Sequence, residues 1–322
     1  SGSAVAATSA VGGFMVPAMT KEGYDRGFSG AVTVTASTTG LLIPPSNVLI
    51  VYSLASGGVS IAALFIAGYI PGLLLMAGLM AVCGIWAKMK GYPVGDRIPF
   101  RDAVRKTIDA IPSLLLIIIV IGGIVAGFFT ATEASVIAVL YALALSVFIY
   151  REVKLNQLPQ ILVKSVETTA IVMLLIGTST AMSWVMSYEN IPQTISDALI
   201  ALSDNPYIIL LTINLILLIV GIFMDMPPAV LIFTPIFLPV VTELGMSPLH
   251  FGIMIVLNLC IGLCTPPVGS VLFVGCGIAK TTISKMFKPL LPLYAAMFVV
   301  LLLVTYVPAF SEALPRLFGL YE

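Results

Sequence analysis

The chain has 322 residues, of which 59% are hydrophobic and only 9% are charged, and its mean hydropathy is +1.12. Soluble domains carry about 25% charged residues, so this composition excludes an ordinary soluble protein and indicates an integral membrane protein. Fifteen basic and fifteen acidic residues leave no net charge, and we therefore expect no nucleic acid among its partners. No phosphate-binding G-x-x-x-x-G-K-[ST] loop occurs, which argues against ATP as the energy source.

Apolar runs of helical length recur along the chain and predict an all-α membrane fold. They cover residues 61–86, 114–129, 136–150, 208–224 and 295–307. None of them alternates apolar with polar residues, as the strands of a membrane barrel do. The four cysteines all lie in apolar stretches, where a thiol acts as a small buried hydrophobe, so we assign no chemistry to them.

The sequence contains an internal repeat at a spacing of 222 residues. Glycines and prolines carry the match, which pairs Pro17 with Pro239, Gly23 with Gly245, Gly30 with Gly252, Gly40-Leu41 with Gly262-Leu263, and Pro44-Pro45 with Pro266-Pro267. Because these residue types set the shape of the backbone, the two halves are expected to follow the same path even where their side chains differ.

The distribution of Lys and Arg orients the chain, because cytoplasmic loops carry the excess of basic residues. One threading places fourteen of the fifteen basic residues inside and only Arg316 outside. In it, residues 28–57 cross outward and residues 249–277 cross inward, so the repeats are inverted, as in many secondary transporters. Residues 207–242 form a hairpin that enters and leaves from outside. By the repeat, the chain begins at the tip of an equivalent first hairpin, whose first arm we expect to be missing.

This threading predicts three parts. Residues 1–87 form the first inverted repeat, with the second arm of a hairpin, a broken helix and a return helix. Residues 88–204 are linking or scaffold helices, and residues 205–322 form the second repeat, with a hairpin, a broken helix and a last helix. Within the middle part, residues 98–111 and 158–164 mix basic and apolar residues at helical spacing, which is typical of helices lying at the membrane surface.

Each repeat places two consecutive prolines in the middle of a spanning segment, and this pattern predicts cation sites. A proline has no N–H, so the carbonyl four residues earlier loses its partner. In this way Pro44 frees Gly40, Pro45 frees Leu41, Pro266 frees Gly262, and Pro267 frees Leu263. Carbonyl oxygens at this depth suit a hard monovalent cation, and the facing hairpin tip adds the hydroxyls of Ser1 and Ser3 or the carboxylate of Asp225. We predict two pseudo-symmetric sodium sites; the alternative is a pair of structural kinks filled by neighbouring Ser and Thr.

Asp225 is the one carboxylate that this threading places deep in the membrane. A charged side chain there costs about 2.5–3.5 kcal/mol on insertion scales and is functional by default. We expect Asp225 to be a sodium ligand. Because no basic residue lies at the same depth to pair with it, a proton carrier is the alternative.

The two breaks differ in the residues that follow them, Ser46-Asn47 in the first and Val268-Gly269 in the second. Polar contacts to the substrate are therefore expected at Ser46 and Asn47. The half-helix that starts at Asn47 also presents free N–H groups, which suit a carboxylate. Capping of that helix by Ser46 alone is an equally open reading. His250 lies near a membrane surface without a visible partner and is interpreted as an interfacial residue, so no catalytic residue is predicted.

Five motifs, spaced along the whole chain, carry a resemblance to a known family. They are SGSA at residues 1–4, GLLIPPS at 40–46, FIAGYIPG at 65–72, GFFTATEA at 127–134 and GLCTPPVG at 262–269. Together they resemble the large membrane subunit, of the DctM type, of tripartite ATP-independent periplasmic (TRAP) transporters.

The resemblance implies an elevator-type secondary transporter in the bacterial inner membrane, driven by sodium. Its partners would be a small four-helix membrane subunit, a periplasmic substrate-binding protein and an organic-anion substrate such as a dicarboxylate or a sugar acid. Carried over by motif, sodium site 1 would use Ser1, Ser3, Gly40, Ile43 and Pro45, and sodium site 2 would use Asp225, Gly262, Thr265 and Pro267. Family members continue upstream of Ser1, so this chain looks truncated, and ligands from that part cannot be named.

Two other classes of protein make different demands on the sequence. A membrane-embedded serine hydrolase built on Ser1 or Ser3 needs a buried His or Lys base within reach, and the chain offers neither at depth. A passive channel does not call for inverted proline breaks with paired hairpins. We therefore expect a transporter subunit and not an enzyme, with proton coupling as the alternative to sodium coupling.

Overall fold

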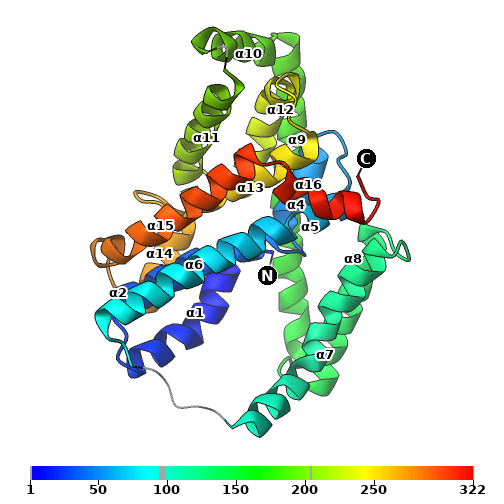
Figure 1. Ribbon diagram of the computed structural model, residues 1–322. Helices are drawn as coiled ribbons and strands as arrows, with labels where there is room; N and C mark the ends of the chain where they lie inside the picture. Colours follow the sequence, from blue (N-terminus) through cyan, green and yellow to red (C-terminus); the bar gives the residue numbers. More distant parts are fainter. Residues whose placement is uncertain (1, 94–98, 204, 322) are drawn as a thin grey trace. The chain divides into compact units, whose positions relative to one another are not determined.

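The computed structural model describes residues 2–93, 99–203 and 205–321, and every regular element in these ranges is a helix (Figure 1). Seven of these helices are long and apolar enough to cross a membrane. An eighth candidate is a pair of helical pieces, Arg26–Leu42 and Asn47–Ala55, that meet at a bend of 49°. The prediction of an all-α integral membrane protein is confirmed.

The chain separates into two compact units. The first unit combines Ser1–Pro93 with Thr178–Glu322, and the second unit is Val94–Gly177. The first unit therefore holds both predicted repeats together with the last part of the predicted linking segment. The division at residues 87 and 204 stays a prediction.

The helices of the first unit fall into two runs along the chain. The first run is α1 (Ala4–Lys21), α2 (Arg26–Ser37), α3 (Thr39–Leu42), α4 (Asn47–Ala55), α5 (Ile61–Ala67) and α6 (Tyr69–Lys90). The second run is α10 (Ile191–Leu202), α11 (Pro206–Phe223), α12 (Met226–Glu243), α13 (Pro248–Cys264), α14 (Ser270–Ala279), α15 (Ile283–Tyr306) and α16 (Ala309–Leu317). The second run also receives the end of α9 (Leu158–Tyr188).

Short polar side chains set where these helices begin. The Asp25 carboxylate accepts a hydrogen bond from the Phe28 N–H at 3.0 Å at the start of α2. The Ser247 hydroxyl accepts one from the His250 N–H at 3.1 Å at the start of α13. Both bonds satisfy amides that have no partner inside the helix. Thus the residues at repeat-equivalent positions 25 and 247 differ in type but cap equivalent helices.

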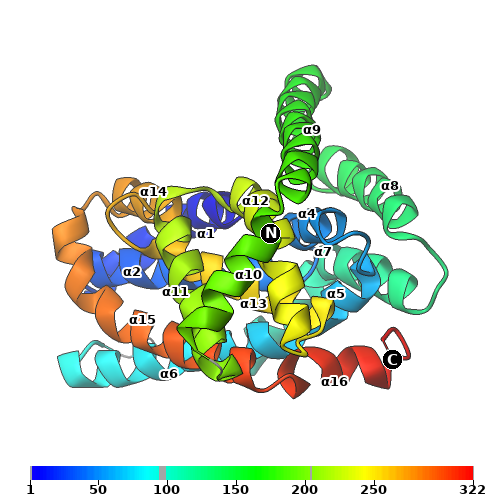
Figure 2. The same ribbon diagram turned by 90° about the horizontal axis from the view of Figure 1, so that it is seen from above.

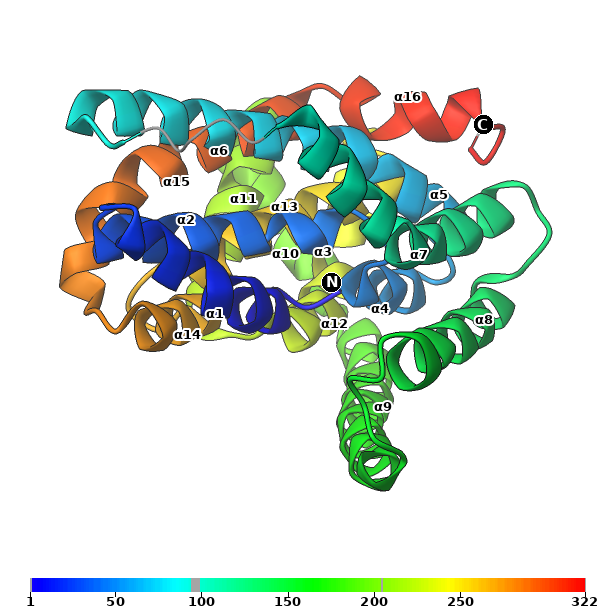
Figure 3. The same cartoon turned by 90° about the horizontal axis from the view of Figure 1, so that it is seen from below.

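The two repeats exchange contacts across the first unit. Helix α1 packs on α14 of the other repeat, and its counterpart α12 packs on α4. In the same way α2 contacts α15, and its counterpart α13 contacts α5. Figures 2 and 3 show both exchanges, with α1 beside α14 and α12 beside α4. Such an exchange is what a two-fold relation between the repeats requires.

Two repeat-equivalent glycines make this packing close. A Cβ atom added to Gly30 of α2 would lie 2.9 Å from the Cβ of Ala279, and one added to Gly252 of α13 would lie 2.3 Å from Cε1 of Tyr52. No side chain fits at such distances, so the helices approach because both positions lack one. Helix α13 is buried at every residue from Leu249 to Cys264 and forms the centre of this unit.

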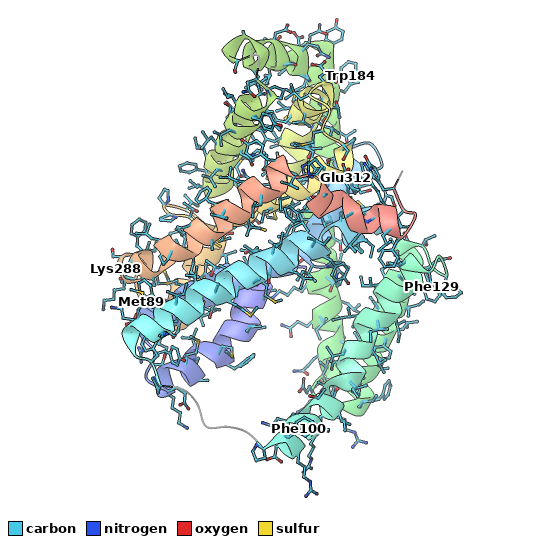
Figure 4. All side chains as sticks on the ribbon, in the orientation of Figure 1. Met89, Phe100, Phe129, Trp184, Lys288 and Glu312 are labelled. Carbon is cyan, nitrogen blue, oxygen red and sulfur yellow. The ribbon has the colours of Figure 1, made fainter. Side chains whose placement is uncertain are left out.

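The second unit is built around a helical hairpin. Its elements are α7 (Phe100–Val125), α8 (Ala131–Leu143), a π-helical turn (Ala144–Ile149), a 3-10 turn (Leu155–Gln157) and the first part of α9. Thr130 and Glu133 form a reciprocal capping box at the start of α8. Figure 4 shows Phe129 at the loop end of the hairpin and Phe100 at the opposite end of α7.

Candidate functional site

The first break separates α3 from α4 and is built by residues 43–46. Ile43 leaves the helical conformation for an extended one, with φ −81° and ψ 123°, as expected for a residue that precedes proline. The Pro44–Pro45 bond is cis. Of the residues predicted for sodium site 1, Gly40 and Ile43 are half-buried and Pro45 is exposed. The break therefore lies partly at the surface of the first unit.

Ser46 and Asn47, the two predicted substrate contacts, differ sharply in their surroundings. Ser46 is buried, and its hydroxyl donates to the Leu41 carbonyl oxygen and accepts from the Leu49 N–H. The hydroxyl thus caps α4 and also takes up a carbonyl that Pro45 leaves without a helical partner. Asn47 is exposed. Of the two, Asn47 is the side chain that is accessible to a substrate.

Gly2, which precedes α1, lies against this break. A Cβ atom added to Gly2 would lie 3.1 Å from both the backbone nitrogen and Oδ1 of Asn47. Ser3 follows directly, and its hydroxyl accepts a hydrogen bond from the Ala6 N–H at 3.3 Å at the start of α1. The structure thus brings Gly2 to the end of the break, while Ser1, also predicted for sodium site 1, lies outside the described residues.

The second break follows α13 and has the same backbone features as the first, an extended residue followed by a cis Pro–Pro bond. Thr265 is extended, with φ −97° and ψ 131°, and the Pro266–Pro267 bond is again cis. Thr265 is half-buried and Pro267 is exposed.

One expectation for this break needs correction. The Gly262 carbonyl is not left without a partner by Pro266, because it accepts the Thr265 N–H at 2.9 Å. The last turn of α13 tightens to satisfy this carbonyl, as helix ends commonly do. A carbonyl oxygen has two lone pairs, so this hydrogen bond leaves one lone pair of the Gly262 oxygen unused by the Thr265 N–H.

The tip of the second hairpin lies against the second break. The Gly269 N–H donates to the Ile222 carbonyl at 3.2 Å, and a Cβ atom added to Gly262 would lie 2.6 Å from the Cα of Gly221. Asp225 begins α12 from this tip, is exposed, and makes no capping hydrogen bond with its side chain. Its carboxylate is therefore not used to cap the helix that it starts.

The contacts at the two breaks involve repeat-equivalent residues. Asn47 and Gly269 are 222 residues apart; Asn47 contacts Gly2 before α1, and Gly269 contacts Ile222 at the end of α11. A side chain at Gly269 is excluded, because its Cβ would lie 2.7 Å from the Thr265 carbonyl oxygen. The two breaks thus have similar backbone conformations but different side chains beside them. Asn47 supplies an amide at the first break, and Asp225 supplies a carboxylate at the second.

A buried polar cluster behind the second break was missed by the sequence analysis. The Asn258 amide donates at 2.8 Å to both the backbone oxygen and Oδ1 of Asn214, and the Asn214 amide donates to the Thr305 hydroxyl at 3.2 Å. All three residues are buried. In addition, the Tyr294 hydroxyl donates to the Cys264 carbonyl. These bonds tie α11, α13 and α15 together beside the break. Two asparagines inside long apolar runs were the available signal.

Two interrupted helices, one of them packed against the α11–α12 hairpin, in a chain whose described residues include seven helices long and apolar enough to cross a membrane, are typical of membrane transport proteins. The family model described as "Tripartite ATP-independent periplasmic transporter, DctM component" matches residues 1–310. The chain belongs to this family, which confirms the resemblance seen in the motifs. Because the family consists of transporter subunits, the expectation that the protein is not an enzyme is confirmed as well.

Similar proteins from three bacteria support the assignment. "Uncharacterized protein YgiK" of Salmonella typhimurium is 56% identical over 99% of this chain and 73% of its own length. The C4-dicarboxylate TRAP transporter large permease protein DctM of Pseudomonas aeruginosa is 39% identical over 99% of this chain and 75% of its own length. The sialic acid TRAP transporter large permease protein SiaM of Vibrio cholerae is 38% identical over 99% of this chain and 74% of its own length.

Proposed function

We propose that this protein is the large membrane subunit of a sodium-driven importer of small organic anions. The observation that carries the proposal is the pair of repeat-equivalent contacts at the proline breaks, between Asn47 and Gly2 at the first break and between Gly269 and Ile222 at the second. Carbonyl and hydroxyl oxygens suit a hard cation. Sodium, as the transported coupling ion, would bind at Ser1, Ser3, Gly40, Ile43 and Pro45 in site 1, and at Asp225, Gly262, Thr265 and Pro267 in site 2.

The class of substrate is inferred from chemistry and from relatives. Asn47 is exposed at the first turn of α4, where an amide side chain and the positive end of the helix dipole favour a carboxylate. The descriptions of two of the three relatives name a substrate, which is a C4-dicarboxylate for one and sialic acid for the other. A dicarboxylate or a sugar acid is therefore the substrate that we propose.

The protein would work with two further components in the bacterial inner membrane and periplasm. The family description names a tripartite periplasmic transporter, which agrees with a small four-helix membrane subunit and a substrate-binding protein. The binding protein would capture the anion and deliver it. Transport would follow an elevator mechanism, in which the hairpins and broken helices move as one body against scaffold helices.

Uptake by the reconstituted complex tests this function. Proteoliposomes that hold the protein with both partners should accumulate a labelled organic acid under an inward sodium gradient. A panel of dicarboxylates and sugar acids identifies the substrate, and omission of the binding protein should abolish uptake. Full uptake in sodium-free buffer with ATP as the only energy source would overturn the proposal.

Proton coupling is the second candidate, because an exposed carboxylate at Asp225 can also carry a proton. The same assay separates the two functions. Accumulation that follows an imposed pH gradient, and does not change when sodium is replaced by choline, would favour the proton.

A further inference from the structure

The first three turns of α7 expose both a row of large apolar side chains and a set of charged side chains. The segment at residues 100–111 is called the α7 arm below. Its large apolar side chains are Phe100, Val104, Ile108 and Ile111, which are 84%, 38%, 57% and 43% exposed. Their spacing of four, four and three residues places them on one face of the helix. The charged side chains Arg101, Asp102, Arg105, Lys106 and Asp109 are exposed as well.

The arm begins where the contact between α7 and α8 ends. The Tyr141 hydroxyl donates to the Pro112 carbonyl at 2.8 Å, and the hydroxyls of Ser113 and Tyr150 lie 3.1 Å apart. These bonds join α8 and the turn after it to α7 at the first residues beyond the arm. In Figure 4, Phe100 marks the free end of α7, away from the loop at Phe129. The arm therefore extends past the part of the hairpin that is held together.

Neither water nor the bilayer core suits this segment. An exposed apolar face of four large side chains is unfavourable in water. Five charged side chains on the same turns are unfavourable in hydrocarbon. The boundary between the two satisfies both faces, and tyrosines such as Tyr141 and Tyr150 are typical of that depth.

Two arginines of the α7 arm favour a lipid with a negatively charged headgroup. Arg101 and Arg105 lie one turn apart and, together with Asp102, Val104 and Ile108, line a hollow of about 540 Å³. Within the described ranges of the chain, neither guanidinium takes part in an ion pair. Two exposed basic residues, Arg151 and Lys154, follow Tyr150 at the same end of the hairpin. The hollow thus combines two guanidinium groups and one carboxylate, which leave a net positive charge, with an apolar wall.

We propose that the α7 arm binds the phosphate of an anionic phospholipid through Arg101 and Arg105, with an acyl chain lying along Val104 and Ile108. Guanidinium groups are well suited to phosphate. The site requires no sodium and no organic acid, and it stands whether or not the proposed transport function is correct.

Lipid retention by the full-length protein tests the site. The protein is purified in mixed micelles of phosphatidylcholine and phosphatidylglycerol, and the ratio of the two retained lipids is measured by native mass spectrometry. A basic residue near an anionic surface contributes a factor of about five in binding. The double variant Arg101→Gln with Arg105→Gln should therefore lower the preference for phosphatidylglycerol roughly 25-fold.

A matched control removes two positive charges from the first unit instead of from the α7 arm. Arg26 and Lys288 are also exposed basic residues but lie in the first unit, so Arg26→Gln with Lys288→Gln should lower the preference for phosphatidylglycerol much less than the glutamine variant of the arm does. The charge-retaining variant Arg101→Lys with Arg105→Lys should keep most of the preference. An unchanged ratio in the glutamine variant of the arm, or an equal loss in the control, would overturn the proposal. The four positions are exposed, and a monodisperse elution profile confirms that each variant is folded.

Discussion

Cys260 and Thr38 are repeat-equivalent residues, and they touch each other. The Cys260 sulfur lies 3.6 Å from the Thr38 carbonyl oxygen, in the buried contact between the two broken helices. Residues related by a two-fold axis meet only on that axis, so the axis that relates the repeats passes between them. Pro44 follows Thr38 by six residues, and Pro266 follows Cys260 by six. The two proline breaks therefore lie at the same distance along the chain from the axis, one on each side of it.

The exposed carboxylate of Asp225 gives the first prediction. If it is a sodium ligand, Asp225→Asn removes a charged contact and should weaken sodium activation by about 1 kcal/mol or more, the difference between charge-assisted and neutral contacts. The concentration of sodium for half-maximal uptake should rise at least about fivefold. The measurement is made at two pH values in wild type and variant. No change at either pH would show that Asp225 is not a ligand.

Ser3, which is repeat-equivalent to Asp225, supplies a matched comparison. Ser3 is expected to give a neutral oxygen to site 1, so Ser3→Ala should shift sodium activation in the same direction as Asp225→Asn, but less. A proton carrier at Asp225 predicts a different pair of results: the Asn variant would lose its response to pH, and its sodium dependence would match wild type.

The neighbours Ser46 and Asn47 give the second prediction. Ser46 is buried and caps α4, so Ser46→Ala should lower stability by about 0.5–2 kcal/mol. Asn47 is exposed, so Asn47→Ala should leave the melting temperature near wild type and raise the substrate concentration for half-maximal uptake. Thermal unfolding in detergent and uptake kinetics are measured on both variants. The reverse assignment of effects would place the substrate contact at Ser46.

The buried pair Asn214 and Asn258 gives the third prediction. Asn258→Ala removes two hydrogen bonds to Asn214 and should destabilise the protein by about 1–3 kcal/mol, because buried acceptors lose their donor. A double-mutant cycle with Asn214→Ala isolates the coupling, for which membrane proteins give about 0.6 kcal/mol on average. Additive effects would mean that the cluster does not act as a unit.

The sequence was sufficient for the all-α class and for the two helix breaks, because backbone-setting residues carry the repeat. Pro44-Pro45 and Pro266-Pro267 cannot continue a helix, and their spacing of 222 residues predicted two equivalent interruptions before any side chain was considered. The resemblance of the motifs then identified the family. What the spacing could not give was the partner of each freed carbonyl, such as the Thr265 N–H that satisfies Gly262.

The site was predicted less completely than the fold. Ser46 and Asn47 are adjacent polar residues and look equivalent in the sequence, yet one is buried as a cap and the other is exposed. That difference depends on the direction in which the chain leaves Pro45. The cluster of Asn214, Asn258 and Thr305 joins three helices that are distant in sequence, so only tertiary contacts reveal it.

The close packing of Gly252 in α13 against Tyr52 in α4 gives the last prediction. A Cβ atom at Gly252 would lie 2.3 Å from the ring of Tyr52, and this ring cannot swing away, because it is buried and its hydroxyl donates to the Pro248 carbonyl. Gly252→Ala should therefore destabilise the protein by about 1–3 kcal/mol, although alanine is the better helix former by up to about 1 kcal/mol. The control is Gly84→Ala in α6, where no atom lies within 4 Å of the added Cβ, and a neutral or slightly stabilising effect is expected. Replacing the ring in a Tyr52→Leu background should reduce the cost of Gly252→Ala. If thermal unfolding shows the same cost in both backgrounds, the contact between α13 and α4 does not set the spacing of the two broken helices.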